Sequence, residues 1–106
     1  MPMTAAQINP YPAVAPPAGA TADIWEGTPP ERIVYSASRG IPDYEVNVWT
    51  SANQFADGTL DDGSRTEPPT VHLEVGASTG MNSDQAGILA AVLIEAADEI
   101  DGWAAR

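Results

Sequence analysis

The stretch from Ser83 to Trp103 constrains the fold of this chain most, because it is the only long segment with a clear helical period. Its apolar residues recur at alternating steps of four and three, the spacing of one helix face: Leu89, Leu93, Ala96, Ile100 and Trp103. Ser83 is predicted to cap the first turn, because its hydroxyl oxygen can accept a hydrogen bond from a backbone N–H group. An amphipathic helix gains most of its stability by packing, so this segment predicts a sheet beneath it.

Two interpretations of the apolar stripe stay open. The stripe covers the protein's own sheet, or part of it pairs with a second copy of the chain. Ile94 lies off the main stripe. It is therefore the helix residue that we predict to make a second, smaller contact with a partner.

Three segments in the middle of the chain are rich in β-branched and aromatic residues and are predicted to be strands: residues 32–38, 44–55 and 70–76. Turns are predicted between them at 39–43, 56–59 and 61–64, with a short edge strand near Thr59-Leu60. These elements predict an α+β fold, a small antiparallel β-meander of three to four strands covered on one face by a single C-terminal helix.

The segment 44–55 has apolar residues on both faces. Val46, Val48 and Thr50 alternate with Asn47, Trp49 and Ser51, and alternate residues of a strand point to opposite faces of the sheet. If the helix covers one face, Trp49 lies on the other. We expect Trp49 to be covered by the N-terminal arm or by another chain.

Residues 1–27 form a Pro/Ala-rich arm that we expect to be flexible, because proline removes amide donors and restricts φ. Trp25 is the exception within the arm. We expect this tryptophan to dock, most simply on the protein's own domain. The folded domain is predicted to span residues 28–106.

The charge of the chain restricts its partners. Fifteen Asp and Glu residues stand against four arginines, the chain has no lysine, and the net charge is −11. Such a chain repels phosphate backbones and anionic lipid, so we expect no direct binding to nucleic acid or membranes. An acidic surface either keeps the protein soluble, meets a basic protein, or imitates nucleic acid.

The same sequence predicts a cytoplasmic protein. No run of eighteen apolar residues is present, so no membrane span is expected. No basic residue and no apolar core stand near its start, so no secretory signal is expected.

The residues that usually carry chemistry are few. The chain has no cysteine and a single histidine, His72, whereas a zinc site needs three or four ligands. The acidic turns do not have the ligand spacing of a calcium-binding EF-hand loop. No nucleophile-elbow or phosphate-binding motif is present. We therefore expect no catalytic residue, metal or cofactor, and we expect His72, beside Glu74 on the strand face opposite the core, to contact a partner.

Several motifs resemble a short domain of unknown function that is widespread in actinobacterial genomes and their phages. The resemblance covers residues 44–104. Its motifs are Val46-x-Val48-Trp49, Gln54-x-x-Asp57-Gly58, Pro68-Pro69-Thr70-Val71-His72-Leu73 and the alanine-rich acidic helix that begins at Ser83. It implies an actinobacterial or mycobacteriophage origin, and it does not point to any particular activity.

Three functional hypotheses follow. The first is a small non-catalytic protein-interaction or regulatory protein, which binds an unidentified protein or itself as a homodimer. Its predicted contact residues are Trp25, Trp49, His72 and Ile94. The second is an acidic mimic of nucleic acid that occupies a basic host protein. The third is a hydrolase or lyase that uses His72 with a carboxylate.

Overall fold

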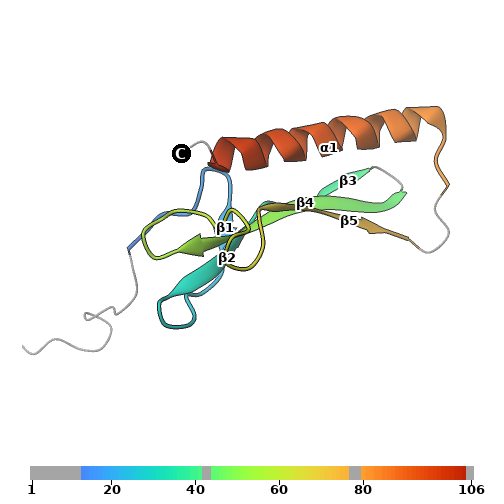
Figure 1. Cartoon of the computed structure of the whole chain (residues 1–106). Helices are drawn as coiled ribbons and strands as arrows, with labels where there is room; N and C mark the ends of the chain where they lie inside the picture. The colour runs from blue at the N-terminus through green and yellow to red at the C-terminus, as the bar shows by residue number, and fades with distance from the viewer. Residues whose placement is uncertain (1–12, 42–43, 77–79, 105–106) are drawn as a thin grey trace, which may run out of the picture.

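The computed structural model describes residues 13–41, 44–76 and 80–104 as an antiparallel sheet with one helix across it (Figure 1). This arrangement confirms the predicted α+β class. The elements, in chain order, are β1 (Thr21–Ala22), β2 (Glu31–Tyr35), β3 (Arg39–Ile41), β4 (Tyr44–Phe55), β5 (Thr70–Val75) and α1 (Ser83–Ala104).

The twelve-residue strand β4 is the centre of the sheet. Strands β2 and β3 pair with successive parts of β4 along one edge, and β5 pairs with it along the other. Asn47, for example, is opposite Gly40 of β3 on one side and Glu74 of β5 on the other. All of these pairings are antiparallel, and β1 extends the sheet beyond β2.

Two of the five strands lie outside the three segments that were predicted to be strands. β3 lies where a turn is predicted at 39–43, and β1 lies within the predicted arm. Both strands are three residues long or shorter, so neither contains enough residues for an alternating pattern to be detected. The sheet is therefore larger than the predicted meander. The predicted edge strand near Leu60 is a single bridge to Gln54.

Helix α1 packs on one face of the sheet (Figure 1). Val46, Val48 and Thr50 of β4 are fully buried beneath it, as is Ala96 of the helix itself. Near the helix C-terminus, Trp103 forms a cluster with Val34 and Ala52, and Leu60 and two alanines of the arm pack around this cluster. The predicted stripe of α1 thus covers the protein's own sheet.

Helix α1 begins at Ser83, as predicted, but its capping residue differs from the prediction by one position. Asn82, not Ser83, caps the helix: its side-chain oxygen accepts a hydrogen bond from the N–H of Gln85, 2.8 Å away. The Gln85 side chain accepts one in return from the N–H of Asn82. This reciprocal pair is a capping box.

The predicted arm is described from residue 13 onward, and this part lies against the domain. Besides β1, three domain side chains donate hydrogen bonds to its carbonyl groups: Arg32 to Val14, Gln54 to Ala15 and Trp103 to Ala18. The expected flexibility and the division between residues 27 and 28 stay predictions.

Candidate interaction surface

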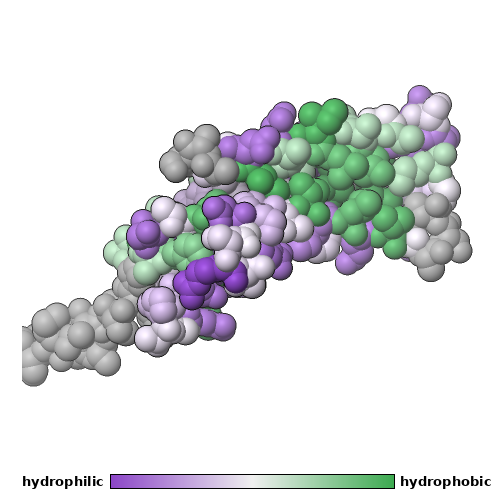
Figure 2. Space-filling model, viewed as in Figure 1, coloured by the Kyte–Doolittle hydropathy of each residue, from purple (hydrophilic) through white to green (hydrophobic). Residues whose placement is uncertain are grey.

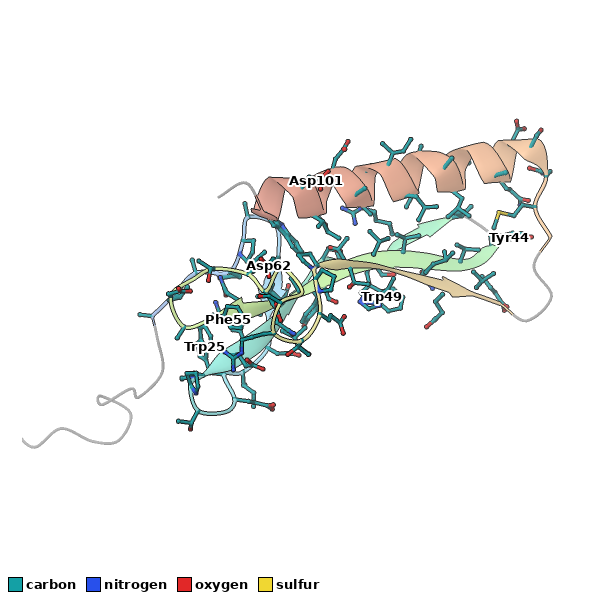
Figure 3. All side chains as sticks on the ribbon, in the orientation of Figure 1. Trp25, Tyr44, Trp49, Phe55, Asp62 and Asp101 are labelled. Carbon is teal, nitrogen blue, oxygen red and sulfur yellow. The ribbon has the colours of Figure 1, made fainter. Side chains whose placement is uncertain are left out.

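The sheet has a second face, which no described helix covers. It consists of the β4 residues that alternate with the buried ones, together with their neighbours on β2 and β5. We call it the open face and define it by Ile33, Tyr35, Asn47, Trp49, Ser51, Asn53, His72 and Glu74. In Figure 3, Trp49 points away from α1, on the far side of the sheet.

Trp49 and His72 are stacked at the middle of the open face. They are directly opposite each other on β4 and β5. Their ring centroids are 5.1 Å apart and their planes differ by 13°, which is a stacked geometry for two aromatic rings. Both residues are half-buried, so each covers part of the other and leaves the rest accessible to a partner.

His72 also contacts Ser51. The Ser51 Oγ and His72 Nε2 atoms are 2.6 Å apart, within the range of a nucleophile and its general base. Among the described residues, no carboxylate bonds the other ring nitrogen of His72. Ser51 lies in the middle of β4, between β2 and β5, so neighbouring strands occupy the backbone N–H groups that could otherwise form an oxyanion hole.

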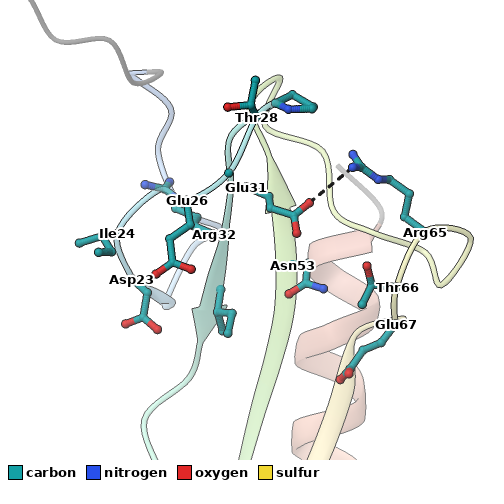
Figure 4. A pocket seen from close by; sticks show the side chains of 13 residues that line it. Asp23, Ile24, Glu26, Thr28, Glu31, Arg32, Asn53, Arg65, Thr66 and Glu67 are labelled. Atoms are coloured by element: carbon teal, nitrogen blue, oxygen red, sulfur yellow. Dashed lines mark ion pairs between the residues drawn. The ribbon is translucent and has the colours of Figure 1, made fainter.

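A hollow of about 720 Å³ lies at one end of the open face (Figure 4). Glu31 and Asn53 form its floor, and Ile33 also lines it. Asp23, Ile24 and residues 26–29 form one side and residues 65–67 the other. Its charged residues are four carboxylates, Asp23, Glu26, Glu31 and Glu67, against two arginines, Arg32 and Arg65.

The arginines of the hollow are already engaged with the protein. Arg32 bonds the Gln54 side chain and the Val14 carbonyl group. Arg65 is 3.9 Å from the Glu31 carboxylate (Figure 4, dashed line). The remaining carboxylates give this end of the open face an acidic rim.

The hollow continues into the aromatic stack. Ile33 is opposite Asn53, and the next outward-facing pair along the same strands is Tyr35 and Ser51. Ser51 in turn contacts His72, which stacks on Trp49. The open face is therefore one continuous surface with a mixed polar and aromatic floor and an acidic rim at one end.

The loop that borders the hollow is held by Asp61. This carboxylate is buried and accepts hydrogen bonds from the backbone N–H groups of four residues, Gly63, Arg65, Thr66 and Glu67. Burial raises the pKa of Asp61, but these four donors more than offset it, so the pKa lies below its ordinary value. Turn chemistry, which the sequence predicts for this segment, thus accounts for Asp61 without a cation.

The two other acids of these turns, Asp57 and Asp62, are exposed and accept hydrogen bonds from residues two positions further along the chain. The side-chain and backbone donors of Thr59 lower the pKa of Asp57, and those of Ser64 lower the pKa of Asp62. Gly58 and Gly63 have positive φ values of 91° and 102°, which favour glycine at these turn positions. Among the described residues, no group of three or more His, Asp or Glu side chains is placed to hold a metal ion.

The predicted contact residues do not form one site. Trp25 docks on its own domain, with the Arg32 guanidinium 4.2 Å from its ring centroid. Ile94 is 64% exposed on the outer side of α1. Only Trp49 and His72 are brought together. Ile33 was not among the predicted contact residues, and it joins this surface because the strand register places it opposite Asn53.

A second group of residues missed by the sequence patterns links β3 to α1. The Arg39 guanidinium contacts the Glu95 carboxylate at 2.9 Å and the Glu99 carboxylate at 3.1 Å. Partial burial lowers the pKa of Arg39, but the two carboxylates more than offset it and raise the pKa above its ordinary value. These contacts hold one flank of α1 to the β3 edge of the sheet.

Within the described part of the chain, no helix has the length and apolar composition needed to cross a membrane. Comparison with known proteins gives no match, whether against family models, curated proteins or solved structures.

Proposed function

We propose that this chain is a small non-catalytic protein-interaction or regulatory protein that binds a basic protein segment on its open face. The observation that carries the proposal is the Trp49–His72 stack on a sheet face that no described helix covers. Partly accessible aromatic residues are enriched at protein interfaces.

The charge around the open face supports a basic partner. The hollow has four carboxylates and two arginines, and the whole chain carries −11. Complementary charge of this kind speeds association and selects partners more than it adds affinity. A nucleic-acid-binding protein is one class of basic partner, and the chain would then act as an acidic mimic of nucleic acid.

Compartment and origin belong to the same proposal. A cytoplasmic location is compatible with a sequence that has no cysteine. An actinobacterial or mycobacteriophage origin rests on the motifs in residues 44–104.

A binding assay with a defined probe tests the proposal. The probe is a labelled extended peptide of alternating lysine and leucine, and its affinity for the full chain is measured at several salt concentrations. Trp49→Ala should weaken binding by about tenfold or more, the loss of an aromatic contact at an interface. The control is Ile94→Ala, which removes an exposed apolar side chain of α1 outside the open face and should leave binding nearly unchanged.

The salt series separates the contribution of the acidic rim to binding from the contribution of Trp49. Rising salt should weaken binding through the acidic rim, while the remaining affinity should depend on Trp49. Equal binding by the Trp49→Ala and wild-type chains would contradict the proposal.

The Ser51–His72 contact favours one alternative function, hydrolysis or elimination with His72 as the base. The 2.6 Å distance fits a base and nucleophile. In this alternative, Ser51→Ala and His72→Ala each abolish turnover of an activated ester. If turnover is present and survives His72→Ala, the alternative is wrong.

A further inference from the structure

The outer edge of β5 is free among the described residues. β5 pairs only with β4, and at six residues it is longer than β1 and β3. Its helix-side residues Leu73 and Val75 are 49% and 44% exposed. A long apolar edge strand with little charge is a ready site for pairing with another strand.

The hydrogen-bonding groups of this edge can be assigned from the register. The N–H of Gly76 bonds to the Glu45 carbonyl of β4. Because alternate residues of a strand direct their N–H and C=O groups to opposite sides, residues 70, 72 and 74 also face β4. Val71, Leu73 and Val75 therefore direct their backbone groups outward, to the free edge.

The sequence of β5 is complementary to itself in one antiparallel register. If Leu73 lies opposite Leu73 of a second copy, Val71 lies opposite Val75. On the other face, His72 then lies opposite Glu74. Apolar residues meet apolar residues, and the only acid of the strand meets its only basic side chain. Such cross-strand pairs stabilise antiparallel sheets.

The helix flank above β5 continues this apolar surface. Glu95 and Glu99 of α1 contact Arg39 on β3, so the other flank of the helix faces β5. About 100° separates successive helix residues, which places on that flank Ala86, Ala90, Leu93 and Ala97. None of the five acidic residues of α1 is among them. Figure 2 shows the resulting hydrophobic area, which extends from α1 over β5.

We propose that the chain forms a two-fold symmetric homodimer in which β5 pairs with β5 of a second copy, centred on Leu73. Pairing of this kind joins the two sheets into one and places the uncharged flanks of the two α1 helices on the same side, facing each other. A two-fold axis requires a self-complementary patch, and the β5 register provides one. The dimer pairs His72 with Glu74 along the edge of the open face and leaves the rest of each face accessible, so it can be tested separately from the function proposed above.

Size-exclusion chromatography with light scattering on the full chain tests the dimer. The expected mass is twice the 11.1 kDa of one chain. Leu73→Lys places two like charges at the two-fold axis and should raise the dissociation constant at least about 100-fold, because opposed like charges cost several kcal/mol. The matched control is Ile33→Lys, at an equally exposed position (48%) on the other face, which should leave the dimer intact.

A cross-link tests the register itself. The chain has no cysteine, so Leu73→Cys introduces a single thiol per chain. Directly opposed residues are about 5.5 Å apart between Cα atoms, within the roughly 4.4–6.8 Å range of disulfides. Leu73→Cys should therefore form an interchain disulfide rapidly under mild oxidation. Val71→Cys should not, because its two copies would be on the order of 13 Å apart along the strand.

Three results would overturn the proposal. The first is a mass of one chain at every protein concentration measured by light scattering. The second is a dimer whose dissociation constant Leu73→Lys leaves unchanged. The third is equal cross-linking of the Val71→Cys and Leu73→Cys variants. The peptide assay distinguishes this failure from failure of the proposed function. Ile33→Lys should weaken peptide binding and spare the dimer, while Leu73→Lys should do the reverse.

Discussion

The two faces of β4 are made from alternate residues of one strand, yet they differ in burial. Val46, Val48 and Thr50 are fully buried under α1, whereas the neighbouring Asn47, Trp49 and Ser51 are half-buried on the open face. The covered face is closed by the protein's own helix. The open face keeps a tryptophan that the described residues cover only in part, which is why we assign stability to one face and binding to the other.

The strongest test of this division compares two tryptophans. Trp103 is 4% exposed in the cluster with Val34 and Ala52, so Trp103→Ala should lower the free energy of unfolding by about 3–5 kcal/mol. Trp49→Ala should lower it by only about 1 kcal/mol. Chemical denaturation followed by circular dichroism measures both. Equal losses would break the distinction between the two faces.

The next largest effect is expected at Asp61. Asp61→Ala leaves four backbone N–H groups without their acceptor, so the thermal midpoint should fall clearly, though less than for Trp103→Ala. Asp62→Ala is the matched control. Asp62 is exposed and bonds only Ser64, and its loss should shift the midpoint little.

Asp61→Ala also sharpens the comparison of the two faces, because the loop that Asp61 holds borders the hollow. Peptide affinity should fall together with stability. An unchanged midpoint and unchanged affinity would show that the loop does not depend on this carboxylate.

A fall in pH should destabilise the fold by protonating the aspartates of the turns at 56–59 and 61–64. The pKa values of Asp57, Asp61 and Asp62 are lowered in the folded chain from 3.8. The unfolded chain therefore takes up protons first as the pH falls. This contribution to stability is fully present above about pH 4 and is lost as the pH falls through the folded-state values.

Denaturation at a series of pH values measures this loss. Asp61→Asn should have a shallower decline below about pH 4 than the wild type, because it lacks one of the titrating groups. An identical decline in the two proteins would exclude Asp61 as a contributor.

The sequence predicted the covered face better than the open one. The period of residues 83–103 and the alternation of residues 44–55 gave α1 and β4 almost to the residue, because each pattern is long and reflects burial directly. β1 and β3 were missed because two or three residues carry no period, and Pro42 next to β3 suggested a turn. The burial of Asp61 was missed because its partners are backbone groups of its own loop.

The open face could be predicted only in part. Trp49 and His72 were each expected on the face opposite the core, but their stacking depends on the pairing of β4 with β5, and strand register is set by tertiary packing. Trp25 and Ile94 were grouped with them because they are apolar residues outside the predicted core. The structure places Trp25 against Arg32 and Ile94 on the outside of α1.

The smallest effect is expected at Ile94. Because its side chain is 64% exposed, Ile94→Ser should change the free energy of unfolding by no more than about 0.5 kcal/mol. It should also leave peptide affinity unchanged, since Ile94 lies away from the open face. A marked loss of peptide binding would move the partner site from the sheet to the helix.

The most direct test of the central claim is an NMR titration of the ¹⁵N-labelled chain with the lysine–leucine peptide. The account predicts that the largest amide shifts fall on β2, β4 and β5, at Ile33, Tyr35, Ser51 and His72, and on the indole N–H of Trp49. The amides of α1 should move little. Shifts concentrated on α1, or spread evenly over the acidic turns with none at Trp49, would contradict the assignment of binding to the open face.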